Sequence, residues 1–322
     1  MEAIYTALFA LLGLAVGSFL NVCIDRLPGG RSVVTPPSQC DSCHRRLAAI
    51  DLIPVLSYLW LRGRCRYCQA SIPQRIVWVE LASGALLAFL YQLYGWTPEL
   101  GITAFWAVVF ILVFVIDLEQ GLILNKVVYP SMVVALLFAG FLDPPWMQME
   151  RWSLSPIVSS AVGGAVGFVM FWLIAVLSAY FLRNRREVPA PEPPLERGSE
   201  GMEYGGSSGK NTENRQDDRC LDTGNVQEPI QEDDDSSETI GGMGWGDVKL
   251  AGLIGLVCGF PLVLLAVVFG AVLGLAGGVL FMARKRRWVS GQTIPFGTSL
   301  AVATMFTILW GEHISNWYMR LL

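Results

Sequence analysis

The chain alternates between long apolar stretches and polar segments, and this pattern predicts a membrane protein. About 20 consecutive apolar residues are needed for a helix to span a bilayer. Eight stretches are candidates for such helices: residues 4–24, 76–95, 99–117, 126–142, 156–182, 247–259, 260–282 and 293–311. The first lacks a basic segment before it and is followed by further spans, which favours an anchor over a cleaved signal peptide. We therefore expect an all-α polytopic membrane protein with about eight transmembrane helices.

Composition agrees with this fold class and also reveals one part of a different character. The chain has 322 residues, is 53% hydrophobic and has a mean hydropathy of +0.48, which is far too apolar for an ordinary soluble domain. Residues 187–239 hold 15 acidic and 4 basic residues, a net charge of −11, so the overall charge of −4 leaves +7 on the remainder. The positive charge therefore lies outside this acidic segment.

The distribution of the arginines predicts the topology. They cluster in three places: between residues 26 and 75, at residues 183–186 and at residues 284–287. The positive-inside rule places all three clusters in the cytoplasm. An even number of spans with the N-terminus outside satisfies all three positions.

These patterns divide the chain into five parts. They are the first transmembrane helix (1–25), a cytoplasmic loop (26–75), helices two to five (76–182), an acidic insert (183–241) and helices six to eight (242–322). The insert is rich in Pro, Glu, Gly, Ser and Asp, and it cannot bury enough apolar surface to offset its ordering entropy. We expect it to be a disordered cytoplasmic linker; the alternative is that its acidity attracts basic substrate segments.

The first loop carries the most specific local motif, a pair of C-x2-C sequences. They are formed by Cys40 with Cys43 and by Cys65 with Cys68. Four thiolates at this spacing supply a closed tetrahedral site for a structural zinc ion. Disulfides are the competing interpretation, but the predicted topology puts the loop in a reducing compartment. Metal ligation would supply much of the folding energy of a loop with so little apolar pattern.

A carboxylate follows a run of glycines at the start of the sixth apolar stretch. Gly244 and Gly246 let the backbone approach a substrate strand closely, and they leave space beside Asp247. An ionisable group at the end of a membrane helix is costly unless it is paired or hydrated, so it is a functional candidate. The simpler alternative is an acidic residue that caps the helix.

A second carboxylate, Asp117, ends the third apolar stretch. That stretch runs toward the cytoplasm, whereas the one that begins at Asp247 runs away from it, so both acids are expected at the cytoplasmic face. Two carboxyl groups within a few ångströms share a proton, and one can activate a water while the other polarises a carbonyl. The sequence thus predicts aspartic-protease chemistry, with no fixed role for either acid.

Together, the Gly-x-Gly-Asp element, Asp117 and the twin cysteine pairs resemble the type IV prepilin peptidases. The similarity covers nearly the whole chain except the acidic insert, including segments 17–22, 26–28, 54–57, 61–65 and 294–297. It implies cleavage of the basic leader of prepilins or pseudopilins at the cytoplasmic face of a bacterial inner membrane, with Asp117 and Asp247 as the catalytic dyad.

The resemblance also implies a second activity. Twin cysteine pairs are typical of bifunctional members, which N-methylate the new N-terminus with S-adenosylmethionine; no binding motif for this donor is readable in the sequence. The implied partners are prepilin substrates and membrane lipid, and no nucleic acid is expected. The chain departs from the family pattern at four positions: His44, Glu119, Leu124 and Asn125. These departures bear on substrate preference more than on catalysis.

Three alternatives remain open at this point. A presenilin-like intramembrane protease shares the Gly-x-Gly-Asp element but does not call for the twin cysteine pairs. A transporter would place its charged site near the bilayer midplane, whereas both acids here are expected at the inner boundary. A non-catalytic zinc-bearing scaffold would tolerate loss of either acid. The oligomeric state is not readable, because small-residue helix faces serve internal packing and self-association equally well.

Overall fold

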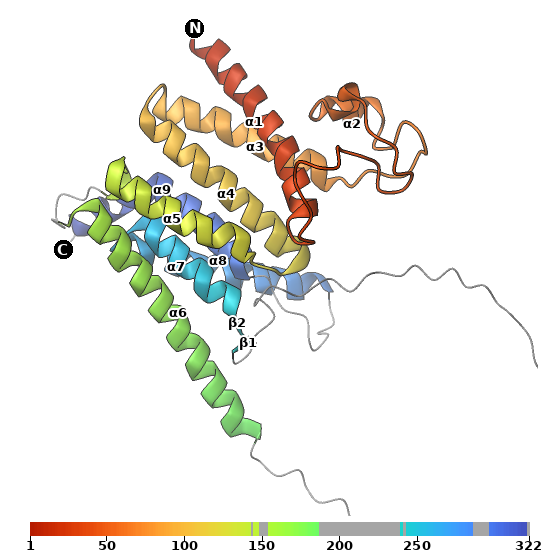
Figure 1. Cartoon of the computed structure of the whole chain (residues 1–322). Coiled ribbons are helices and arrows are strands. Elements are labelled where there is room, and N and C mark those ends of the chain that lie inside the picture. Colours follow the sequence, from red (N-terminus) through yellow and green to blue (C-terminus); the bar gives the residue numbers. More distant parts are fainter. Residues whose placement is uncertain (143, 148–153, 187–238, 241–242, 286–295, 321–322) are drawn as a thin grey trace, which may run out of the picture.

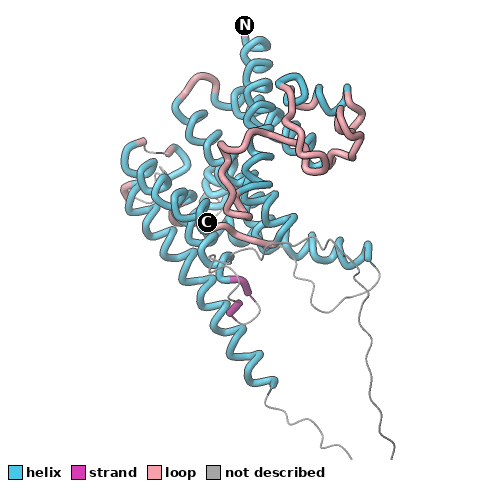
Figure 2. Tube along the Cα trace, turned by 45° about the vertical axis from the view of Figure 1, so that its right-hand side comes forward, coloured by secondary structure: helices cyan, strands magenta, loops and turns pink. Residues whose placement is uncertain are grey.

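A computed structural model describes residues 1–142, 144–147, 154–186, 239–240, 243–285 and 296–320. These residues form a bundle of helices with a loop region beside it (Figure 1). The predicted all-α class is confirmed, and each predicted apolar stretch overlaps one helix. Figure 2 shows that non-helical chain is concentrated in the connection between the first two long helices.

The long helices begin and end within a few residues of most predicted boundaries. They are α1 (Glu2–Arg26), α3 (Arg75–Tyr94), α4 (Pro98–Gln120), α5 (Asn125–Phe141), α6 (Pro156–Arg186), α7 (Trp245–Cys258), α8 (Leu262–Lys285) and α9 (Phe296–Met319). The short elements are η1 (Ala49–Leu52), α2 (Leu56–Trp60), η2 (Pro145–Met147) and two strands, β1 (Thr239–Ile240) and β2 (Met243–Gly244). The strands pair antiparallel.

In the part of the chain that the structure describes, five helices are long and apolar enough to cross a membrane: α1, α3, α4, α6 and α8. Helix α5 is apolar but has only 17 residues. Helix α7 has 14 residues, about 21 Å of helix, and is therefore shorter than the hydrocarbon core of about 30 Å. The molecule is a polytopic helical membrane protein, and the count of eight spans stays a prediction.

Most of the predicted acidic insert, residues 183–241, lies outside the described residues. Its two ends are described and are ordered into elements: α6 continues to Arg186, and Thr239 and Ile240 form β1. The β1–β2 pairing, with Thr239 opposite Gly244, leads directly into α7. The glycine-rich element is thus held by a short strand pair before the helix begins.

Glycines let several helices pack closely. A Cβ atom added to Gly13 of α1 would lie 2.5 Å from the carbonyl oxygen of Ser83 in α3. On the other side of the bundle, Gly163 of α6 packs directly on the backbone of Gly255 in α7. Such contacts replace lipid with dense van der Waals packing.

Helix α7 lies in the interior of the bundle, in contact with α5, α6, α8 and α9. Its side chains Leu250, Leu253 and Ile254 are completely buried. Because α7 is surrounded by protein rather than lipid, it does not have to match the bilayer thickness. The short helix that carries Asp247 is therefore placed by its neighbours.

Candidate active site

Asp117 lies in the last turn of α4 and is buried, with 4% of its surface exposed. The sequence interpretation ended this helix at Asp117, but the helix continues to Gln120 and stops at Gly121, whose φ of +64° is left-handed. The extra turn has a local cause, because glycine adopts this conformation without strain and its N–H bonds back to the Asp117 carbonyl. Asp117 is therefore inside the helix and faces the bundle.

The start of α9 holds the Asp117 carboxylate. The backbone N–H of Thr298 donates a hydrogen bond of 2.6 Å to Asp117 Oδ2. A helix N-terminus carries unpaired N–H groups and a partial positive charge, both of which stabilise an anionic carboxylate. The contact joins residues 181 positions apart in the sequence.

Gly297 makes this contact possible. A Cβ atom at this position would lie 2.9 Å from Asp117 Oδ2, closer than side-chain carbons are found in proteins. The sequence interpretation named residues 294–297 only among the segments that resemble the family, and it assigned no role to Gly297 or Thr298. The sequence did offer one signal for their role, because these residues begin an apolar stretch at the same membrane boundary as Asp117.

Asp247 is the third residue of α7 and is partly exposed. Its Oδ2 atom lies beside Gly244, where an added Cβ would be 3.8 Å away. A side chain at position 244 would therefore lie in van der Waals contact with the carboxylate, and glycine leaves that volume unfilled. Asp247 is in the first turn of the helix, where the helix dipole favours a carboxylate, but the N-cap residue is Gly244 and no side chain caps the helix, so the capping alternative does not describe Asp247.

Gly246 has a packing role that the sequence interpretation did not include. A Cβ atom there would lie 2.9 Å from Cβ of Ile123, in the connection between α4 and α5. The side chain of Ile123 also lies within 3.3 Å of the position of a Cβ on Gly297. Ile123 is thus a shared neighbour of the two glycines that flank the two acids.

The structure brings Asp117 and Asp247 to the same end of the bundle. Gly297 touches Asp117, Gly246 precedes Asp247, and Ile123 lies against both glycines. Two neighbouring like charges are costly at the end of an apolar bundle, so the arrangement favours one shared proton.

Lys249 lies on the same helix as Asp247, and its side chain contacts Asn125. Its ammonium group donates a hydrogen bond of 3.1 Å to Asn125 Oδ1 at the start of α5, and its side chain is buried. The rings of Tyr129 and Trp245 lie 5.6 and 5.9 Å from Nζ, within cation–π range. The lysine therefore ties α5 to α7 beside the acid pair.

Arg75 forms a second polar cluster at this end of the bundle. It donates 2.6 Å to Asp25 Oδ1 at the end of α1 and 2.7 Å to Glu119 Oε2 at the end of α4. The cluster joins the ends of three helices and gives Glu119 a structural partner. It also marks the level at which these helices leave the apolar core.

The four motif cysteines converge, as predicted from their spacing. The Sγ atoms of Cys40, Cys43, Cys65 and Cys68 all lie within 4.8 Å of one another. Cys40 Sγ is 3.7 Å from Cys68 Sγ, close to the edge of about 3.8 Å expected for four sulfurs at 2.3 Å from a zinc ion. The described cysteines form no disulfides, so the four sulfurs of the cluster remain available as metal ligands.

The backbone around Cys65 favours its thiolate form. The N–H groups of Cys68 and Tyr67 donate to its sulfur and lower the pKa of the Cys65 thiol to about 7. Metal ligands must be deprotonated. The donor set and its hydrogen bonds therefore fit a structural zinc ion.

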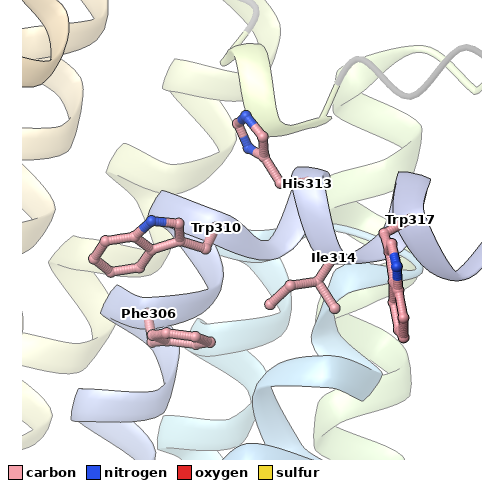
Figure 3. Close-up of a pocket in the computed structure, with 5 residues that line it drawn as sticks. All are labelled: Phe306, Trp310, His313, Ile314 and Trp317. Carbon is pink, nitrogen blue, oxygen red and sulfur yellow. The ribbon is translucent and has the colours of Figure 1, made fainter.

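A hollow of about 330 Å³ lies toward the other end of α9 (Figure 3). It is lined by aromatic and apolar side chains and one histidine: Phe306, Trp310, His313, Ile314 and Trp317. Trp310 is 12 residues beyond Thr298, about 18 Å along the helix. The hollow is therefore separate from the acid pair.

The fold and the acid pair define a polytopic membrane protein with two carboxyl groups at one end of its bundle. Comparison with known families agrees with this class: the model described as the type IV leader peptidase family matches residues 104–279. This match covers more than half of the chain and includes both acids, so the chain belongs to the type IV leader peptidase family. A second model, the bacterial peptidase A24 N-terminal domain, matches residues 11–94, which contain the four cysteines.

Two curated relatives are similar over nearly their whole length, and a third over about half. The chain is 26% identical to a prepilin leader peptidase/N-methyltransferase of Stutzerimonas stutzeri, covering 96% of this chain and 92% of that protein. It is 27% identical to the protein of the same name from Pseudomonas putida, covering 99% and 96%. A Myxococcus xanthus protein of that name is 36% identical over 52% of this chain and 47% of its own length. No solved structure matches the chain.

Proposed function

We propose that this protein cleaves the leader peptide of prepilins or pseudopilins and then N-methylates the new N-terminus. Family membership and the names of the relatives support this proposal. The observation that supports it most directly is the convergence of Asp117 and Asp247, two acids from different helices, at one end of the bundle around Ile123.

The acid pair acts on water and on the scissile carbonyl. One carboxylate takes a proton from a water molecule, whose oxygen attacks the carbonyl carbon of the leader's last peptide bond. The other, protonated carboxyl gives its proton to the carbonyl oxygen. When the tetrahedral intermediate collapses, the carboxyl that took the water proton gives it to the leaving nitrogen as the C–N bond breaks, and one hydroxyl of the intermediate returns its proton to the other carboxylate as the new carboxyl group forms, so that the pair again holds one proton.

Thr298 and Gly297 position Asp117 in this mechanism. The amide of Thr298 fixes one oxygen of the carboxylate, so that the other can face water and substrate. Because Gly244 has no side chain beside Asp247, the extended peptide is proposed to approach the carboxylate at this position. The two acids titrate as a pair, and neither is assigned the role of base or acid.

Cys40, Cys43, Cys65 and Cys68 would hold a zinc ion with four thiolates, which closes its coordination sphere and leaves it a structural role. S-adenosylmethionine supplies the methyl group for the second activity. Its acceptor is the amine that cleavage releases at the acid pair. The donor site is not assigned to residues.

The protein is proposed to lie in the bacterial inner membrane with its N-terminus outside. The acid pair and the cysteine cluster then face the cytoplasm. The arginine-rich loop between α1 and α3 supports this orientation. The acid pair lies at the bundle end where α4 ends and α7 and α9 begin, and the Arg75 cluster at the end of α4 is close in sequence to Asp117.

Mass spectrometry of a co-expressed prepilin-like substrate tests both activities. The intact enzyme should yield a substrate without its leader and with a methyl-sized mass increment. Loss of the leader without the increment would retain the peptidase and remove the methylation claim. An untouched leader with folded enzyme would refute the proposed function and favour the scaffold or transporter.

A further inference from the structure

The loop between α1 and α3 contains an apolar hairpin, residues 49–60, that neither the acid pair nor the cysteine cluster uses. Its single charged side chain is Asp51. Asp51 is neutralised by Arg66, whose guanidinium lies 2.7 Å from Oδ1, and only 2% of the Asp51 side chain is exposed. The surface of the hairpin is therefore almost free of charge.

The hairpin presents its large apolar side chains outward. In α2, Leu56, Leu59 and Trp60 have the i, i+3, i+4 spacing that places side chains on one helix face. Trp60 is 77% exposed and Leu59 62%. The preceding turn adds three further exposed residues: Ile50, Leu52 and Ile53. Contiguous exposed apolar surface of this kind marks an interaction site.

A buried carboxylate fixes the depth of the hairpin. The backbone N–H of Val55 donates a hydrogen bond of 2.7 Å to Glu80 Oε2, and the hydroxyl of Ser18 also bonds to Glu80. Glu80 lies five residues beyond Arg75 along α3, which is about 7.5 Å along the helix axis. Since Arg75 marks the charged level at which the helices end, Val55 lies beyond that level, on the apolar side.

The views of the structure agree with this placement. Figure 1 shows α2 beside α1 and the first part of α3 rather than beyond their ends, and Figure 2 shows the same loop region next to the bundle after a 45° turn. The loop thus leaves the bundle and returns alongside it. The outward face of α2 is on the side where a membrane-spanning helix meets lipid.

The backbone at Val55 is strained in order to make the contact with Glu80. Val55 has φ +60° and ψ −47°, and the N–H of Leu56 bonds to the carbonyl oxygen of Pro54. This is a γ-turn of the rare hand, and it is unfavourable for a β-branched residue. Strain of this kind persists where the surroundings hold it and often marks a functional position.

We propose that residues 49–60 form an interfacial membrane anchor in the lipid leaflet at the acid-pair end of the bundle. The occupants of its apolar face are lipid acyl chains. Its depth of about 7.5 Å agrees with the 5–10 Å to which amphipathic segments enter a bilayer, and Trp60 is a residue type that favours the interface. The exposed Arg62 and Arg64, which follow the hairpin, meet lipid phosphates.

This anchor has a consequence for the cysteine cluster. Cys65 follows the hairpin by five residues, so an inserted hairpin holds the cluster against the membrane surface. The loop is then attached at three places: the end of α1, the start of α3 and the lipid. A substrate cut at the membrane boundary would meet a loop held at that same level.

Photo-crosslinking in lipid nanodiscs tests the anchor in the full-length protein. A photoreactive amino acid is placed at position 59, and the matched control places it at position 41, an exposed site beside the cysteine cluster. Both positions are exposed, so neither replacement disturbs a core. The expected result is lipid adducts at position 59, in nanodiscs with anionic lipid, and severalfold fewer at position 41.

Equal lipid labelling at the two positions, or adducts of position 59 with protein in place of lipid, would overturn the proposal. A second comparison uses the contact with Glu80. Glu80→Leu removes the acceptor of the Val55 N–H and should reduce lipid labelling at position 59, whereas Glu80→Gln keeps an acceptor oxygen and should retain it. Unchanged labelling in folded Glu80→Leu protein would refute the role of Glu80 in setting the depth. None of these measurements depends on cleavage of a substrate.

Discussion

Replacing Gly297 with alanine should slow leader cleavage without unfolding the protein. The added methyl carbon would lie 2.9 Å from Oδ2 and 3.1 Å from Cγ of Asp117, so the carboxylate must move. That movement breaks the 2.6 Å hydrogen bond from the Thr298 amide. Hydrogen bonds to charged groups contribute about 1.5–3 kcal/mol.

If all of that stabilisation is lost in the transition state, the rate falls by about 10- to 150-fold, since about 1.4 kcal/mol corresponds to a factor of ten. The assay is single-turnover cleavage of a saturating prepilin-like peptide by purified enzyme. Gly101→Ala is the matched control because it lies in the same helix as Asp117 and an added Cβ meets nothing within 4 Å. An unchanged rate for Gly297→Ala would refute the proposed positioning of Asp117 by α9.

Two further predictions concern the supports of the site. Cys43→Ser removes one of the four converging ligands, so the zinc content measured by elemental analysis should fall below one ion per chain. The control is Cys23→Ser, which changes a buried thiol outside the cluster and should leave the zinc content unchanged. Full zinc content in Cys43→Ser would contradict the assigned site. Gly163→Ala should destabilise the packing of α6 on α7 by about 1–3 kcal/mol, because its methyl group meets backbone. Thermal unfolding in detergent measures this loss of stability, and the control is Gly277→Ala, where an added Cβ meets open space. Equal melting temperatures for the two variants would show that α6 and α7 can move apart at no cost.

The features that the sequence predicted well are those set by short-range chemistry. Membrane helices must satisfy their backbone internally, so apolar length placed the helices near their observed ends. The spacing of Cys40, Cys43, Cys65 and Cys68 predicted their convergence because tetrahedral ligation requires it. The predicted direction in which each helix crosses the bilayer placed Asp117 and Asp247 at the same end of the helix bundle.

The features that the sequence did not predict depend on distant contacts. The end of α4 was placed at Asp117 because an acid is polar, but the Thr298 amide and the packing of Gly297 let that acid be buried within the helix. Gly246 looked like a residue for substrate approach, and its observed contact is Ile123. The link between Val55 and Glu80 joins a loop to a membrane helix, and no periodicity in the sequence reports it.

The central claim is that Asp117 and Asp247 form one catalytic unit. The most direct test is cleavage of a prepilin-like substrate by purified Asp117→Asn and Asp247→Asn proteins, with Glu119→Gln as the control for removal of a nearby carboxylate. We predict that each aspartate variant stays folded and loses cleavage, that the double variant is no worse than either one, and that Glu119→Gln still cleaves. Retained cleavage in either folded aspartate variant would contradict the account.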